Sequence, residues 1–154
     1  MTDMATKWLT PQEMAAWRAI LATSNDLWRV IDRDLDAHDL DGGDYQLLAM
    51  VSESPDKRIR LCDLADQLRL TRSGLTRRMD GVVKKKLIAR VQSTEDGRVA
   101  FAEMTPKGME LLKVVAPEHL RTVRRVIFDH LNAAEVKAIA SGLGKIAAQL
   151  ESEL

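Results

Sequence analysis

The sequence has almost no cysteine, which excludes a disulfide framework: Cys62 is the single cysteine among 154 residues. Four prolines and eight glycines are too few for a collagen or a Pro/Gly-rich disordered chain. The longest apolar runs, such as 47–51, are far too short to cross a bilayer. Since no apolar run precedes Pro11, we expect no signal peptide, no membrane partner and a reducing, cytoplasmic compartment.

The composition is that of an ordered, globular protein of modest size. Hydrophobic residues make up 45% and charged residues 30% of the chain, which suits one domain, or one domain that completes its core by pairing. Basic and acidic residues balance at 23 each. Taken alone, this net charge of zero argues against a generic binder of polyanions.

The balance of charge conceals a segregation along the chain. Residues 1–56 carry 4 basic and 11 acidic side chains, a net charge of −7, whereas residues 57–98 carry 12 basic and 5 acidic ones, a net charge of +7. Residues 99–154 hold 7 of each. A basic module within an otherwise acidic chain is typical of nucleic-acid-binding proteins. A basic face that is merely solvated gives the same counts, so the surrounding pattern has to decide.

The two ends of the chain predict long amphipathic helices with narrow apolar seams. One helix runs from Thr10-Pro11 to about residue 38, a second starts at Thr105-Pro106, and the last starts at a capping box over 132–135. Pro117 predicts a kink in the second of these. Such seams favour pairing with a second copy of the chain, and packing within one chain is the alternative.

The middle third predicts short helices followed by a β-hairpin. Asp44 is expected to cap a helix that Pro55 ends. The next helix covers 61–68, and after a tight turn Thr71 caps a further helix with apolar residues at Leu75, Met79, Val82 and Val83. Two stretches rich in β-formers, from Ile88 to Val91 and from Val99 to Met104, flank a polar tip at 93–97.

This order of elements predicts a mainly α (α+β) fold. Residues 41–104 form a winged helix-turn-helix with a two-stranded β-hairpin as its wing, and residues 1–40 and 105–154 form a helical dimerisation region. The helix after Thr71 suits the major groove of double-stranded DNA, and an Arg on the hairpin tip suits the minor groove. Asp96 is placed to hold the guanidinium of Arg98. The candidate DNA contacts are Thr71, Arg72, Ser73, Thr76, Arg77, Lys84, Asp96 and Arg98, and the consecutive lysines 84–86 are expected to meet phosphates.

The run from Leu61 to Gly108, LCDLADQLRLTRSGLTRRMDGVVKKKLIARVQSTEDGRVAFAEMTPKG, resembles the core of the MarR family of bacterial transcriptional regulators. The marks are the helix pair ending in Ser-Gly-Leu-Thr, the Leu-Ile-x-Arg entry into the hairpin, the wing Asp-x-Arg, and the Met-Thr-x-x-Gly that starts the next helix. Lys86 departs from the pattern, since the family often has Gly there. The resemblance implies a homodimer, joined by its outer helices, that binds a palindromic operator and acts as a repressor relieved by a small ligand.

A ligand pocket is expected among the aromatic residues of the first two helices. Trp17 and Trp28 lie eleven positions apart, hence close to one helical face, and Tyr45 follows on the next helix. The three are candidates for an apolar pocket that takes a small aromatic or lipophilic effector. An aromatic stripe at this spacing more often belongs to a core.

Neither a redox centre nor a metal site is favoured. Cys62 is expected to be a small apolar filler beside the helix 61–68, with a redox-responsive regulator that uses Cys62 as the alternative. Redox sensors of the resembled family usually carry the reactive cysteine in the first helix, which has none here. The three histidines show no i,i+4 pairing and no cysteine partner, so no metal and no cofactor are expected: His38, His119 and His130.

An enzyme is not expected, because the sequence holds no nucleophile elbow and no phosphate-binding glycine motif. The stretch 141–145, Ser-Gly-Leu-Gly-Lys, lacks the spacing of a nucleotide loop and lies within a predicted helix. A winged helix used only for protein contact is the remaining alternative. Salt separates the two readings, because DNA binding weakens steeply as salt rises and a DNA-independent module shows no such slope.

Overall fold

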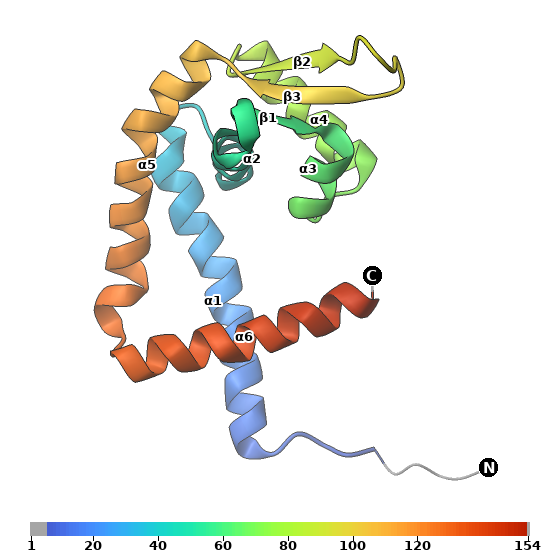
Figure 1. The fold of residues 1–154 in the computed structure, drawn as a ribbon. Helices are drawn as coiled ribbons and strands as arrows, with labels where there is room; N and C mark the ends of the chain where they lie inside the picture. The colour runs from blue at the N-terminus through green and yellow to red at the C-terminus, as the bar shows by residue number, and fades with distance from the viewer. Residues whose placement is uncertain (1–5, 154) are drawn as a thin grey trace, which may run out of the picture.

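The computed structural model describes residues 6–153 as a helical frame that carries a small winged domain (Figure 1). Residues 1–5 and 154, which the predicted dimerisation region includes, lie outside the described part. In the frame, α1 (Pro11–Asp36) runs beside α5 (Pro106–Val126), and α6 (Ala133–Glu153) leaves the foot of α5 at a steep angle. The 3-10 turn η2 (Phe128–His130) joins α5 to α6.

The winged domain lies at the end of the frame opposite the start of α6, and Arg69 after α3 lies 3.7 Å from Glu151 near the end of α6 (Figure 1). It contains three helices and a three-stranded antiparallel sheet of order β1-β3-β2, which confirms the predicted class of fold. Its elements are α2 (Gly42–Glu53), the 3-10 turn η1 (Pro55–Lys57), β1 (Arg58–Arg60), α3 (Leu61–Gln67), α4 (Arg72–Lys84), β2 (Ile88–Gln92) and β3 (Ala100–Met104).

Side-chain caps start the helices where the sequence predicts. The hydroxyl of Thr10 accepts a hydrogen bond from the Glu13 amide at 3.2 Å, and the Glu13 carboxylate accepts one from the Thr10 amide at 2.7 Å. Thr71 and Thr105 cap α4 and α5 through their hydroxyls, and the box over 132–135 caps α6. The starts of α4, α5 and α6 are therefore set by short-range chemistry.

The prediction that Asp44 caps α2 is wrong. Asp41 is the cap, since its Oδ1 accepts the Asp44 amide at 2.7 Å and the helix begins at Gly42. The amide of Gly42 donates to Asp32 of α1 at 2.8 Å, which holds this early start in place. The carboxylate of Asp44 is not free to cap, because two cations of α4 bind it.

Helix α5 continues through Pro117, from Pro106 to Val126, as the sequence predicts, whereas the sheet differs from the sequence pattern. The hairpin gains a third strand, β1, in which Ile59 pairs with Ala102 of β3. Three residues are too short for a period-two pattern to be recognised, so β1 had no signal in the sequence.

The core lies where α2, α3 and α4 meet the sheet and the upper half of α5. Three of the four predicted apolar residues of α4 are buried, Leu75, Met79 and Val82, while Val83 is 36% exposed. Burying each such side chain stabilises the fold by about 1.5–3 kcal/mol. These contacts hold α4 on the domain by its inner face and leave its outer face to solvent. The largest fully buried side chains of the domain and its surroundings are Leu47, Leu48, Val51, Leu64, Met79, Val82, Leu87, Ile88 and Val115.

Lys86 ends α4 in the backbone conformation that glycine favours. Its φ is 62°, and the amides of Lys86 and Leu87 donate to the carbonyls of Val83 and Val82 at 2.9 and 3.0 Å. This pattern is a Schellman motif with Lys86 at the left-handed position, where glycine is usual. The departure from the MarR pattern therefore leaves the helix end unchanged and costs conformational strain.

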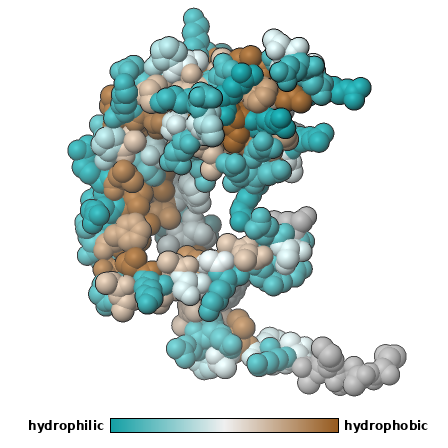
Figure 2. Space-filling model, viewed as in Figure 1, coloured by the Kyte–Doolittle hydropathy of each residue, from teal (hydrophilic) through white to brown (hydrophobic). Residues whose placement is uncertain are grey.

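The long helices expose large apolar residues. None of the residues of α6 is buried, and Figure 2 shows hydrophobic side chains gathered over the lower half of α5. None of the helices in the described range 6–153 is long and apolar enough to cross a membrane. The large apolar residues exposed along the frame include Trp17, Leu21, Trp28, Leu120, Phe128, Ile139, Leu143, Ile146 and Leu150.

Candidate nucleic-acid interface

The outer face of α4 carries the polar residues that the sequence singled out. The hydroxyl of Thr76 donates to the carbonyl of Arg72 at 2.9 Å, and those of Thr71 and Ser73 lie 3.2 Å apart. Within residues 6–153, Arg72 and Arg77 form no ion pair. The helix thus presents guanidinium groups beside the hydroxyl groups of serine and threonine. The exposed residues at its start and along it include Thr71, Arg72, Ser73, Thr76, Arg77 and Lys84.

Asp96 shapes the wing differently from the prediction. Its Oδ1 accepts the backbone amide of Arg98 at 2.9 Å, and its own amide donates to the Ser93 hydroxyl at 3.3 Å. The prediction that Asp96 holds the guanidinium of Arg98 is therefore wrong, because a carboxylate two residues earlier reaches the backbone of a tight turn more readily than the end of a long side chain. The guanidinium of Arg98 is left exposed.

A cleft between α3, α4 and the hairpin gathers four arginines. Its volume is about 430 Å³, and Arg60, Arg72, Arg90 and Arg98 line it. Thr76 and Leu75 of α4 form part of the wall. Like charges are brought together here without acidic partners among the lining residues, so the cleft suits an anion.

Sequence reasoning missed two of these arginines. Arg90 belongs to the Leu-Ile-x-Arg motif, which offered a signal, whereas Arg60 lies on β1 and offered none. Both side chains reach the cleft only because β1 and β2 flank β3 on the same sheet.

Cys62 also lines this cleft, and the prediction of an apolar filler is wrong. The thiol is exposed, and its Sγ donates to Oδ1 of Asp63 at 3.3 Å. Helix α3 turns Leu64 and Ala65 toward the core, so Cys62 faces away from it.

Lys85 is not a candidate phosphate contact, because it turns inward. Its Nζ lies 3.1 Å from Oδ2 of Asp44, and the side chain is 29% exposed. Arg78, which the sequence did not single out, points to the same place and donates to Asp41 at 2.5 Å. Arg78 and Lys85, two of the twelve cations of the basic segment, are thus paired with carboxylates of the protein itself.

Opposite charges stabilise one another in the cluster formed by Asp41, Asp44, Arg78 and Lys85. Burial by itself raises the pKa of Asp41, but hydrogen bonds from the Asp44 amide and the Arg78 guanidinium outweigh it, and the pKa lies below its ordinary value. Burial likewise acts to lower the pKa of Arg78, while its bonds to Asp41 and Asp44 bring the pKa above its ordinary value. Both groups are therefore charged at neutral pH.

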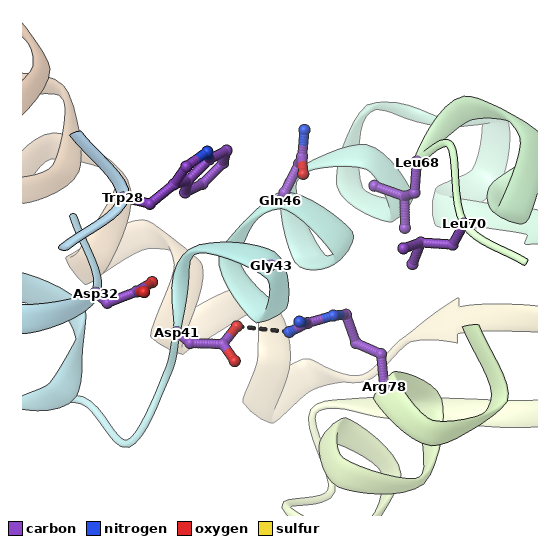
Figure 3. A pocket seen from close by; sticks show the side chains of 8 residues that line it. All are labelled: Trp28, Asp32, Asp41, Gly43, Gln46, Leu68, Leu70 and Arg78. Carbon is purple, nitrogen blue, oxygen red and sulfur yellow. Dashed lines mark hydrogen bonds and ion pairs between the residues drawn. The ribbon is translucent and has the colours of Figure 1, made fainter. Parts of the chain in front are cut away.

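The three aromatic candidates for a ligand pocket do not lie together. Trp28 lines a groove of about 290 Å³ between α1, α2 and the turn after α3, in which Arg78 and Asp41 form one wall (Figure 3). Tyr45 lies against His119 of α5, with ring centroids 4.2 Å apart. Trp17 does not line the groove and is 49% exposed. The full lining is Trp28, Asp32, Asp41, Gly43, Gln46, Leu68, Leu70 and Arg78.

The histidines contact aromatic and acidic side chains. Nε2 of His38 lies 2.7 Å from Oε2 of Glu118, which ties the end of α1 to α5. Burial lowers the pKa of His119 beside Tyr45. Among the described residues, no group of three His, Cys, Asp or Glu side chains is arranged to hold a metal ion.

A short helix, a tight turn, a second helix with an exposed polar face and a hairpin with a basic tip define a winged helix-turn-helix protein. A family model described as MarR family matches residues 38–99. The structure is similar to that of AbsC, a MarR family transcriptional regulator from Streptomyces coelicolor, with a TM-score of 0.91 and 33% identity over 96% of this chain and 99% of that one. The chain belongs to the MarR family, whose members are transcriptional regulators and not enzymes.

Two other relatives agree with this assignment. Sco3205, a MarR family regulator from Streptomyces coelicolor solved in complex with DNA, has a TM-score of 0.91 and 30% identity over 96% of this chain and 93% of that one. The HTH-type transcriptional regulator MhqR of Bacillus subtilis is 26% identical over 116 residues, 75% of this chain and 78% of the relative.

Proposed function

We propose that the protein is a homodimeric, sequence-specific regulator that binds a palindromic DNA operator, with α4 in the major groove and the wing in the adjacent minor groove. The arginine cleft between α4 and the wing carries this proposal. Four guanidinium groups in one cleft of about 430 Å³, beside the free N-terminal amides of α4, match the phosphate backbone where it passes from one groove to the next.

The exposed side chains fit a division of labour along α4. Arg72, Ser73, Thr76 and Arg77 occupy the first half of the helix, from which side chains reach base edges most easily. Arg can bind guanine through two hydrogen bonds. Lys84 lies two turns beyond Arg77 and suits a phosphate. The structure of Sco3205 with DNA supports this use of the fold.

Selection of duplexes from a random library by the wild-type chain tests DNA recognition. We expect one enriched motif of two inverted half-sites, because a two-fold dimer presents two α4 helices about one DNA turn apart. Binding to the enriched duplex should weaken steeply between about 50 and 200 mM salt. Enrichment of no motif, with binding that is independent of salt, would favour a module that contacts only protein.

The dimer rests on the apolar faces of α1 and α6. In α6, Ile139, Leu143, Ile146 and Leu150 are 43–54% exposed and recur at steps of four, three and four, which places them on one stripe. Trp17 and Leu21 expose a similar apolar surface on α1. A second copy buries such stripes, and completing the burial of each residue is worth about 1 kcal/mol.

A repressor is the regulatory role that one relative supports, since the HTH-type transcriptional repressor YetL of Bacillus subtilis is 25% identical over 91 residues, 59% of this chain and 54% of that one. Relief of repression by a small ligand is what the family resemblance adds. The groove beside Trp28 is the place for an aromatic effector, because an indole ring, two leucines and a guanidinium meet there. Titration of aromatic acids and phenols against tryptophan fluorescence tests this role. Trp28→Phe should abolish the response and Trp17→Phe should not; equal responses in both variants would place the ligand elsewhere.

A further inference from the structure

Two cations, Arg78 of α4 and Lys85 at the C-terminal cap of that helix, point toward the start of α2 instead of outward. They are seven positions apart, two helical turns, and Lys85 keeps a helical backbone, so both side chains leave the same face of the helix. Asp44 of α2 receives both: its Oδ1 accepts from Arg78 Nη1 at 2.8 Å and its Oδ2 accepts from Lys85 Nζ at 3.1 Å. The Asp44 side chain is 12% exposed. One shielded carboxylate therefore bridges the middle and the end of α4.

The residues around Asp44 complete this cluster. Arg78 also donates to Asp41, the cap of α2, and Lys85 also donates to the carbonyl of Asp39. The guanidinium of Arg78 lies directly on the backbone of Gly43, where an added Cβ would come within 2.3–2.6 Å of its three terminal atoms. A glycine at position 43 is thus required for Arg78 to reach both carboxylates.

The cluster restrains motions that apolar packing leaves loose. Leu75, Met79 and Val82 attach α4 to the core, but apolar contacts have little directionality and permit small rotations and slides. Charge-assisted hydrogen bonds are directional, and two of them spaced two turns apart on one carboxylate oppose both motions. A recognition site must hold its contact residues to within about 0.5 Å to discriminate between bases.

We propose that Asp44, Arg78 and Lys85 are positioning residues that set the rotation and depth of α4 for reading DNA sequence, without touching DNA themselves. This inference rests on the proposed function, in which α4 enters the major groove. It assigns to an acidic residue a favourable part in binding a polyanion.

The sign of the effect of Asp44→Asn distinguishes positioning from simple electrostatics. If Asp44 acts only through its charge, its neutralisation raises the affinity for every duplex, because one negative charge less faces the phosphates. If Asp44 positions α4, the variant binds the duplex selected by the wild type about tenfold or more weakly, as a misread base pair would cause, and keeps its affinity for an unrelated duplex. A folding defect lowers both affinities.

Asp80→Asn is the matched control. Asp80 is exposed on α4 and forms no ion pair within residues 6–153. Its neutralisation should raise both affinities slightly, by the electrostatic effect alone. Asp44→Glu, which keeps the charge, should recover part of the affinity for the selected duplex.

Gly43→Ala provides a test that changes no charge and removes no hydrogen-bonding group. The added methyl displaces the flexible end of Arg78, so the domain stays folded while the link to Asp44 is broken. We expect the same selective loss of about tenfold for the selected duplex. In an Arg78→Met background, Gly43→Ala should have no further effect, because the group that it displaces is gone.

The results separate the two proposals. If the wild type enriches no motif, the proposed function fails. If the wild type binds its selected duplex and both Asp44→Asn and Gly43→Ala bind it as well as or better than the wild type, with unchanged thermal unfolding, DNA recognition stands and the positioning role is refuted. Equal losses for selected and unrelated duplexes, again with unchanged thermal unfolding, would refute it as well.

Discussion

Arg98 at the tip of the wing offers a clean perturbation of the proposed interface. Its side chain is exposed and forms no ion pair within residues 6–153, and the hydrogen bond that shapes the turn uses its backbone amide, which alanine retains. Arg98→Ala should therefore leave the fold intact. Any change in DNA binding then reports the loss of the guanidinium alone.

The expected loss follows from what an arginine contributes in a groove. Removing such a contact costs about 1–3 kcal/mol, a weakening of roughly 5- to 150-fold in Kd. Removing one cation that displaces a counterion also lowers the salt slope by about 0.9, so the wild-type-to-variant ratio of affinities should shrink about threefold between about 50 and 200 mM salt.

Fluorescence anisotropy with the duplex selected by the wild type measures both quantities. Arg29→Ala is the control, because Arg29 lies on α1 with 83% of its side chain exposed and pairs only with Asp26, at 3.7 Å, within the described residues. The control should bind as the wild type does. Equal affinities and slopes for Arg98→Ala and the wild type, or equal losses in the two variants, would refute the placement of the wing on DNA.

Four further predictions concern the dimer, the cleft, pH and the end of α4. Leu143→Glu should convert a dimer into a monomer in sedimentation experiments, because it places a charge on the apolar stripe of α6. Lys145→Glu, on the opposite face of α6, should remain a dimer. If both variants sediment as monomers, the role of the stripe is contradicted. Labelling Cys62 with a bulky maleimide should block DNA binding, since the thiol opens into the arginine cleft, and Cys62→Ser should bind DNA and resist the reagent; binding by the labelled wild type would place DNA elsewhere. Burial lowers the pKa of His119 below its ordinary value of 6.5, so as the pH falls the histidine is protonated in the unfolded chain before it is protonated in the folded one. The stability of the folded protein therefore decreases as the pH drops below 6.5. His119→Phe should reduce this decrease in thermal unfolding experiments, and an unchanged pH profile would contradict the prediction. Lys86→Gly should raise the free energy of unfolding by up to about 1 kcal/mol by relieving the positive φ, with chemical denaturation as the assay; a loss of stability would mean that the lysine compensates for its strain.

The elements that short-range chemistry defines were predictable. Thr71 and Thr105 each cap a helix through a bond to an amide three residues on, and the apolar spacing of Leu75, Met79 and Val82 identifies the inner face of α4. The outward direction of Arg77 follows from the same periodicity. The fold class and the exposed candidates on α4 were therefore accessible from sequence.

The cluster beneath α4 was not predictable, because its members are far apart in the chain. Asp44 meets Arg78 across 34 positions and Lys85 across 41. Nothing local distinguishes Lys85, which is bound inside, from Lys84, which faces solvent. The cap of α2 was misplaced for the same reason, since the choice between Asp41 and Asp44 depends on which carboxylate the cations of α4 bind.

Other side chains were misjudged because their exposure depends on contacts between distant segments of the chain. Cys62 and Trp28 both suit an apolar interior by residue type, yet Cys62 opens into a cleft and Trp28 lines a groove. Arg60 reaches the cleft through a three-residue strand whose pairing with β3 spans about forty positions of chain, shown by Arg60 opposite Phe101. Such placements follow from how distant segments meet, which no local pattern encodes.

Hydroxyl-radical footprinting of the wild-type chain on its selected duplex is the sharpest test of DNA binding by a two-fold dimer. We expect two protected half-sites related by a dyad, centred about one helical turn apart, roughly 34–36 Å, on one face of the duplex. We also expect protection of the flanking minor grooves that disappears in Arg98→Ala. A single protected patch without symmetry, or flanking protection that persists in the variant, would contradict this mode of binding.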